Sequence, residues 1–144
     1  MRRNDLRPSH ARSTKMTAPA SRILLALSAV IMVLGGPLHA AAFKKAAAVL
    51  AASNIPAFYC GSFKGLWLAD SATLITLAMT FAVIAVRPAA AARPVVMLLA
   101  VIPGATAELV YFFVGPFFAA HLLMLAAIAA FVGGLLLPQA GAES

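Results

Sequence analysis

A stretch of 43 residues that carries a single charge constrains the fold of this chain more than any other feature. Residues 95–137 contain no Lys, Arg or Asp, and Glu108 is the only formal charge among them. Gly115 and Pro116 divide the stretch into two apolar runs. A membrane-spanning helix needs about 20 mainly apolar residues, so the stretch has the length of two spans joined by a turn. An ionisable group inside such a span is a candidate functional residue.

The rest of the chain has a similar composition. Charged residues make up 10% of the 144 residues, whereas soluble domains carry roughly 25%. Two further apolar runs precede residue 95, which gives four predicted spans, at about residues 23–42, 66–86, 95–114 and 117–137. We therefore predict an all-α integral membrane protein, with a four-transmembrane-helix bundle over residues 21–138 and a short C-terminal tail over residues 139–144.

The segment before the first span has a different character. Residues 1–20 are rich in Arg, Ser, Thr and Pro, so we predict a disordered basic tail, with either Met1 or Met16 as the true start. The first apolar run also resembles a cleavable signal peptide, with a basic flank, a core at residues 23–34 and small residues at 40–42. Its apolar length of about 20 residues favours a retained span.

The distribution of basic residues predicts the orientation. The net charge is +7, and most of the basic residues lie before the first span or between the second and third. These eight residues are Arg2, Arg3, Arg7, Arg12, Lys15, Arg22, Arg87 and Arg93, against Lys44, Lys45 and Lys64 on the other side. The positive-inside rule then predicts a multi-pass protein of the inner (cytoplasmic) membrane with N-in/C-in topology. The basic tail is a topology signal that meets anionic lipid in the bilayer, and nucleic acid is not an expected partner.

The longest predicted connection runs from residue 43 to residue 65. Its first part is good helix-forming sequence, and Asn54-Ile55-Pro56 should end any helix there. Aromatic residues surround the point where the chain returns to the membrane, and we interpret them as an interfacial belt. They are Phe58, Tyr59, Phe63 and Trp67.

Each predicted span contributes one ionisable residue to the outer half of the bilayer. At about 1.5 Å per residue, His39, Asp70, Glu108 and His121 all lie within about 10 Å of the outer ends of their spans. Helical spacing predicts polar faces that turn inward, because hydrocarbon cannot satisfy them. These faces are Ser28, Met32, Gly35 and His39; Asp70, Thr73, Thr76 and Thr80; and Gly104, Glu108, Tyr111 and Gly115.

Convergence of the four ionisable residues would allow several chemistries. Imidazole and carboxylate are ordinary ligands for a divalent metal such as zinc or iron, and His39 with His121 could instead ligate haem. Glu108, with Asp70 and Tyr111, could carry protons or hold a cationic or quinone-like ligand. The structural alternative is that Asp70 and His121 reach interfacial water and that His39 caps its helix. Cys60 is the single cysteine, which argues against thiol–disulfide exchange.

Three functions follow from these alternatives. The leading hypothesis is a non-transporting membrane protein whose outer-leaflet polar site binds a metal, haem, lipid or small ligand. The second is a proton-coupled small transporter that uses Glu108 and acts as a homo-oligomer. The third is a structural or accessory subunit that packs on a membrane partner through small residues, namely Ala126, Ala127, Ala130, Gly133 and Gly134. The layout is similar to that of small multidrug transporters, but their carboxylate lies in the first span, so no residue role is carried over.

Overall fold

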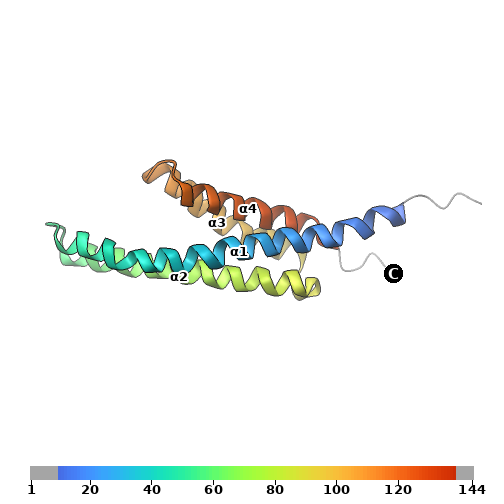
Figure 1. Cartoon of the computed structure of the whole chain (residues 1–144), viewed down its shortest axis with the longest axis horizontal. Helices are drawn as coiled ribbons and strands as arrows, with labels where there is room; N and C mark the ends of the chain where they lie inside the picture. Colours follow the sequence, from blue (N-terminus) through green and yellow to red (C-terminus); the bar gives the residue numbers. More distant parts are fainter. Residues whose placement is uncertain (1–9, 139–144) are drawn as a thin grey trace, which may run out of the picture.

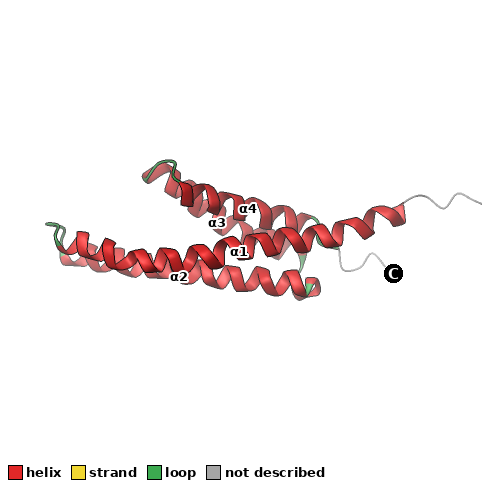
Figure 2. Cartoon of the chain, viewed as in Figure 1, coloured by secondary structure: helices red, strands yellow, loops and turns green. Residues whose placement is uncertain are grey.

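The computed structural model describes residues 10–138, and its regular structure there is entirely helical (Figure 2). Its elements are α1 (His10–Ala51), α2 (Ala57–Val86), the 3₁₀ turn η1 (Pro88–Ala90), α3 (Arg93–Phe113) and α4 (Phe118–Leu135). Four helices in this part of the chain are long and apolar enough to cross a membrane, with residues Pro19–Ala51 as the candidate segment of α1. The prediction of four apolar helices is confirmed, and it indicates a multi-pass membrane protein.

Helices α3 and α4 match their predicted spans closely, but α1 and α2 are longer than predicted. Both continue into the predicted connection over residues 43–65, so that only residues 52–56 separate them. The break itself falls at Asn54-Ile55-Pro56 as predicted, and Pro56 is the N-cap of α2. Helix α1 also begins at His10, where we predicted disorder through residue 20. Residues 1–9 and the predicted tail over 139–144 lie outside the described residues.

The four helices form two antiparallel hairpins that share one contact surface. Helix α1 packs against α2 in the first hairpin, and α3 packs against α4 in the second (Figure 1). The hairpins meet where α1 packs against α4, whereas α2 and α3 touch very little. At the α1–α4 contact the Ser21 hydroxyl donates to the Gly133 carbonyl over 2.8 Å. A Cβ atom built on Gly133 would lie 3.0 Å from Leu25 Cγ, so glycine permits this close approach.

The small residues of α4 lie inside the molecule. Ala126 and Ala130 have no exposed surface, and Gly133 and Gly134 are buried against α1 and α3 respectively. From the sequence, these residues are predicted as a packing surface for a partner subunit. That prediction is wrong for this surface, because the chain uses it to join its own hairpins.

The hydrophobic core lies toward the end of the bundle where α2 passes into α3. Its largest fully buried side chains are Phe81, Leu25, Met32 and Val96. Toward the opposite end the two hairpins diverge, and the tip of the α1–α2 hairpin extends past the tip of the α3–α4 hairpin (Figure 1). Residues at equal height on different hairpins are therefore not neighbours in that half.

Helix lengths explain why the first hairpin extends further. The 21 residues of α3 measure about 32 Å, close to the bilayer hydrocarbon thickness of about 30 Å. The 30 residues of α2 measure about 45 Å, which exceeds that thickness by about 15 Å. When α3 spans the membrane, the tip of the α1–α2 hairpin extends beyond one face of it.

Two adjacent glycines in α1 provide a matched test of this packing. A Cβ atom on Gly36 would lie 2.7 Å from Ile75 Cγ1 and 3.3 Å from the Ser71 carbonyl oxygen, whereas one on Gly35 meets nothing within 4 Å. We expect Gly36→Ala to destabilise the protein by about 1–3 kcal/mol through overpacking. Gly35→Ala should be neutral or stabilising, since alanine is the better helix former. Unfolding by SDS in mixed micelles measures both, and equal effects would contradict the close α1–α2 contact at Gly36.

Candidate functional site

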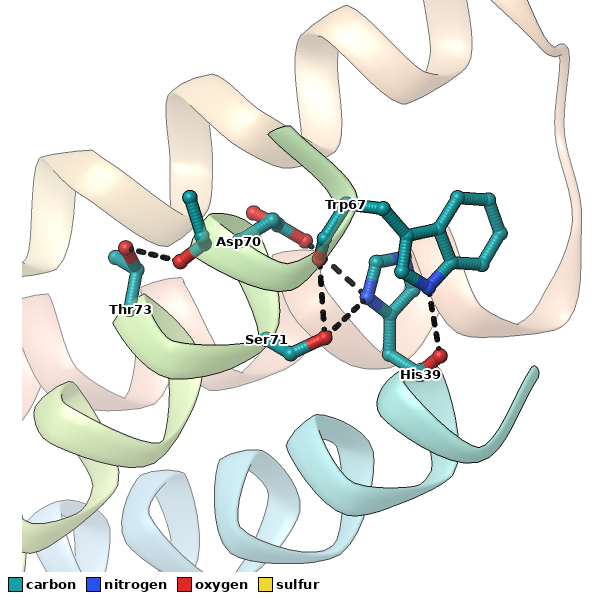
Figure 3. A network of polar contacts seen from close by, with 6 residues as sticks. His39, Trp67, Asp70, Ser71 and Thr73 are labelled. Atoms are coloured by element: carbon teal, nitrogen blue, oxygen red, sulfur yellow. Dashed lines mark hydrogen bonds and ion pairs between the residues drawn. The ribbon is translucent and has the colours of Figure 1, made fainter. Parts of the chain in front are cut away.

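The ionisable residues that the structure brings together lie between α1 and α2. His39 of α1 faces Trp67, Asp70 and Ser71 of α2, and we call these four residues the His39 cluster (Figure 3). The imidazole and indole rings stack with centroids 4.4 Å apart and an interplanar angle of 6°. His39 Nδ1 lies 2.9 Å from Ser71 Oγ and 3.7 Å from Asp70 Oδ2. The Trp67 indole N–H donates to the His39 carbonyl oxygen over 2.8 Å.

Local sequence explains why these side chains meet. Gly36 lies one helical turn before His39 and lets α1 approach the backbone of α2 at Ser71. On α2, Trp67, Asp70 and Ser71 are spaced at three and four residues, so they lie on one side of the helix. The close helix contact and the helical spacing together place the imidazole among the three α2 side chains.

The hydrogen bonds of the cluster select one histidine tautomer. The Ser71 hydroxyl lies 3.1 Å from the Trp67 carbonyl oxygen, to which it donates its single proton. Nδ1 of His39 then carries a proton and donates to Ser71 Oγ, and the same N–H faces the Asp70 carboxylate. This arrangement satisfies every close polar contact in the cluster. Within residues 10–138 the Nε2 atom has no hydrogen-bond partner, so it is available to a ligand.

The cluster is closed on one side and open on the other. Ser71 is buried, whereas the His39 and Asp70 side chains are 32% and 34% exposed. Sixteen residues separate Asp70 from the end of α2 at Val86, a height of about 24 Å. In hydrocarbon about 30 Å thick, the cluster therefore lies near the face from which the α1–α2 hairpin projects.

The other predicted site residues lie on the second hairpin. The rings of Tyr111 and His121 meet edge to face, with centroids 5.5 Å apart, and His121 Nδ1–H donates to the Phe117 carbonyl oxygen over 2.8 Å. Glu108 is exposed on α3, one turn before Tyr111. The structure thus forms one pair, His39 with Asp70, and places Glu108 and His121 on the other hairpin.

The predicted four-residue metal site does not form in this geometry. Among the described residues no three His, Cys, Asp or Glu side chains lie close enough together to hold a metal ion. His39 and His121 belong to hairpins that diverge in this half of the molecule, so they do not face each other across a haem (Figure 1). Equal depth implies proximity only in a bundle that is closed along its whole length, and this bundle is closed at the opposite end.

Two of the three polar faces that were predicted to turn inward do not face the interior of the bundle. Thr73 and Thr76 are exposed, and each donates its hydroxyl proton to the carbonyl four residues earlier, at 2.9 and 2.8 Å. A threonine hydroxyl that hydrogen-bonds to a carbonyl of its own helix does not require the threonine to face the core. The buried residues of α3 are Val96, Ala100, Pro103 and Ala107, so Glu108 lies just outside the packed face.

The predicted face of α1 is largely correct. Ser28 and Met32 are buried and His39 is half-buried, but Gly36 rather than Gly35 makes the close contact with α2. Trp67, predicted as part of the interfacial aromatic belt, lies in the His39 cluster, and Ser71 is a cluster residue outside the predicted polar faces. Their four-residue spacing around Asp70 is the signal that would have identified them.

Removing the Ser71 hydroxyl tests whether the His39 cluster stabilises the α1–α2 hairpin. Ser71→Ala should lower the free energy of unfolding by about 1 kcal/mol, because His39 Nδ1 loses its closest partner in a mostly buried position. Thr73→Val is the matched control, since the Thr73 hydroxyl bonds only within its own helix, and it should stay within about 0.5 kcal/mol of wild type. Trp67, the single tryptophan, reports the transition by fluorescence. Equal stability of the two variants would show that the cluster adds nothing to the α1–α2 contact.

Comparison with known proteins adds no family to this description. No protein-family model, no curated protein and no solved structure matches the chain. No residue role is carried over from a relative, so the functional argument rests on the chemistry of the His39 cluster.

Proposed function

We propose that this chain is a multi-pass protein of the inner membrane that binds a small polar ligand at the His39 cluster, on the outer side. The excess of basic residues in the N-terminal segment and at Arg87 and Arg93 supports N-in/C-in topology. Leu25, Ala29 and Met32 of α1 belong to the hydrophobic core, which supports retention of the first span. The α1–α2 tip then projects from the outer face.

The observation that carries this proposal is the contact between His39 and Asp70, whose side chains are both partly exposed. Ser71 and Trp67 hold His39 in place through hydrogen bonds, and the Asp70 carboxylate lies 3.7 Å from His39 Nδ1. About a third of each of the two side chains is exposed, and Nε2 of His39 has no hydrogen-bond partner among residues 10–138. A pre-organised acceptor at the membrane surface suits a ligand that carries an amine or another strong hydrogen-bond donor.

The surroundings favour a zwitterionic ligand. Lys64 lies six residues before Asp70 on α2, about 9 Å further from the membrane centre. A phosphoethanolamine group carries an ammonium that matches Asp70 and a phosphate that matches a lysine. The ligand class we infer is therefore an amine-bearing phosphate compound, and the headgroup of an outer-leaflet phospholipid is one source of it.

The alternative of a proton-coupled transporter depends on Glu108. This residue lies on the exposed side of α3, on the hairpin that does not contain the His39 cluster. A transport pathway through Glu108 would need a second copy of the chain to enclose it. Glu108→Gln thus distinguishes the two functions, because the binding proposal predicts no effect of that change.

Trp67 fluorescence provides a direct binding test, since the indole stacks on His39. In nanodiscs, replacing phosphatidylcholine by phosphatidylethanolamine should change Trp67 emission, and replacement by phosphatidylglycerol should not. Asp70→Asn should weaken the response at least about tenfold, the loss expected for a hydrogen bond to a charged group. Glu108→Gln and His121→Ala are the controls. If either control weakens the response as much as Asp70→Asn does, the four residues act as one site and the proposed separate cluster is wrong.

Single cysteines test the orientation. In a Cys60→Ser background, Gly61→Cys places an exposed thiol near the hairpin tip, and Ala89→Cys places one in the α2–α3 connector. A membrane-impermeant maleimide should label Gly61→Cys in intact cells and should label Ala89→Cys only after permeabilisation. The reverse pattern would place the His39 cluster on the cytoplasmic side.

A further inference from the structure

The weak contact between α2 and α3 leaves an open groove along one side of the bundle. It has a volume of about 470 Å³ and is bounded by α2, η1 and α3. Met79 and Val83 form part of the α2 wall, and Val95 and Leu99 form the α3 wall. The lining is almost wholly apolar, and Thr80, which also lines it, donates its hydroxyl proton to the Thr76 carbonyl oxygen. The walls of the groove are therefore hydrocarbon-like, and the Thr80 hydroxyl proton is already used in a hydrogen bond.

Two arginines lie close in sequence to one end of the groove. Ala90 and Ala91 of the connector close this end, and Arg87 and Arg93 flank them in sequence. Arg87 is exposed and Arg93 half-exposed, and neither forms a salt bridge within residues 10–138. The acids of that part of the chain, Asp70 and Glu108, lie about 24 and 22 Å away along their helices. No acidic side chain of residues 10–138 therefore competes with an external anion for the two arginines.

The length of the groove matches one leaflet of a bilayer. Its furthest lining residue on α2 is Thr76, ten residues before the end of the helix at Val86. Ten residues of helix measure about 15 Å, which is half of a hydrocarbon layer about 30 Å thick. An object that runs from the connector to the bilayer midplane would fill it.

We propose that the groove holds an acyl chain of an anionic phospholipid whose phosphate is bound by Arg87 and Arg93. Guanidinium groups bind phosphate through paired hydrogen bonds, and basic pockets between helices on the cytoplasmic side are a known setting for anionic headgroups. A second copy of the chain is the other possible occupant, and the variants below distinguish it from a lipid.

This lipid site is separate from the His39 cluster and does not rest on the function proposed for it. The cluster lies near the outer ends of α1 and α2, whereas the groove extends from the opposite end. Asp70→Asn therefore leaves the proposed lipid site intact, and failure of ligand binding at the cluster says nothing about the groove.

Spin-labelled lipids in vesicles test the headgroup contact. We expect the protein to restrict spin-labelled phosphatidylglycerol in preference to spin-labelled phosphatidylcholine. The double change Arg87→Gln and Arg93→Gln should reduce this preference at least about fivefold, the contribution of a single arginine near an anionic surface. Arg22→Gln is the matched control, because Arg22 is an exposed arginine of α1 that does not line the groove. An unchanged preference in the double variant would overturn the proposal.

A second pair of variants tests the acyl chain. Thr80→Phe should fill the groove and lower the amount of restricted phosphatidylglycerol, whereas Ala82→Phe, at an exposed α2 position outside the lining, should not. Loss in Thr80→Phe alone supports seating of a chain in the groove. Equal lipid restriction in the two variants would overturn that seating, as would disruption of a stable dimer by Thr80→Phe. The arginine variants change solvent-accessible side chains, so they decide the headgroup contact even if Thr80→Phe fails to fold.

Discussion

The architecture depends on two close contacts of α1, each made possible by a glycine. Gly36 lets α1 meet the backbone of α2 at Ser71, and Gly133 lets α4 meet α1 at Leu25. Helices in lipid gain little from hydrophobic burial against each other, so close packing and cross-helix hydrogen bonds must hold them together. Here the Ser71 hydroxyl lies at the first contact and the Ser21 hydroxyl at the second. Helix α1 thus connects both hairpins, and the other helices are arranged around it.

Two features follow from this arrangement. Because α1 packs on both α2 and α4 while α2 and α3 contact each other little, a groove remains between α2 and α3. Because the core of large side chains lies near the α2–α3 connector, the hairpins can diverge at the other end (Figure 1). The groove and the separation of the His39 cluster from Glu108 therefore have a common cause, which is the position of the α1 contacts.

Sequence reasoning predicted the number of helices and most of their ends because both depend on local composition. Four apolar runs and the Asn54-Ile55-Pro56 break are visible in the sequence alone. The length of α1 and α2 was underestimated because Ala-rich sequence after Phe43 continues a helix without being needed to span a membrane. The helix faces were harder to predict. Thr73 and Thr76 resemble an inward polar stripe, yet each hydroxyl is satisfied by a carbonyl of its own helix, so packing around Gly36 and Ser71 decides which face is buried.

The common depth of the ionisable residues has a simpler physical cause than a shared site. An ionised side chain is costly at the bilayer centre, and the cost falls as the group approaches the interface. Asp70 and Glu108 lie about 24 and 22 Å from the connector ends of their helices, within reach of the opposite surface. This constraint acts on each helix separately, so it places acids at one level without bringing them together. What distinguishes Asp70 from Glu108 is its contacts, since Asp70 faces an imidazole that Ser71 and Trp67 hold in place, whereas Glu108 lies on an exposed helix face. In a membrane protein, shared depth of ionisable residues therefore becomes an argument for a site only when a close helix contact joins the helices that carry them.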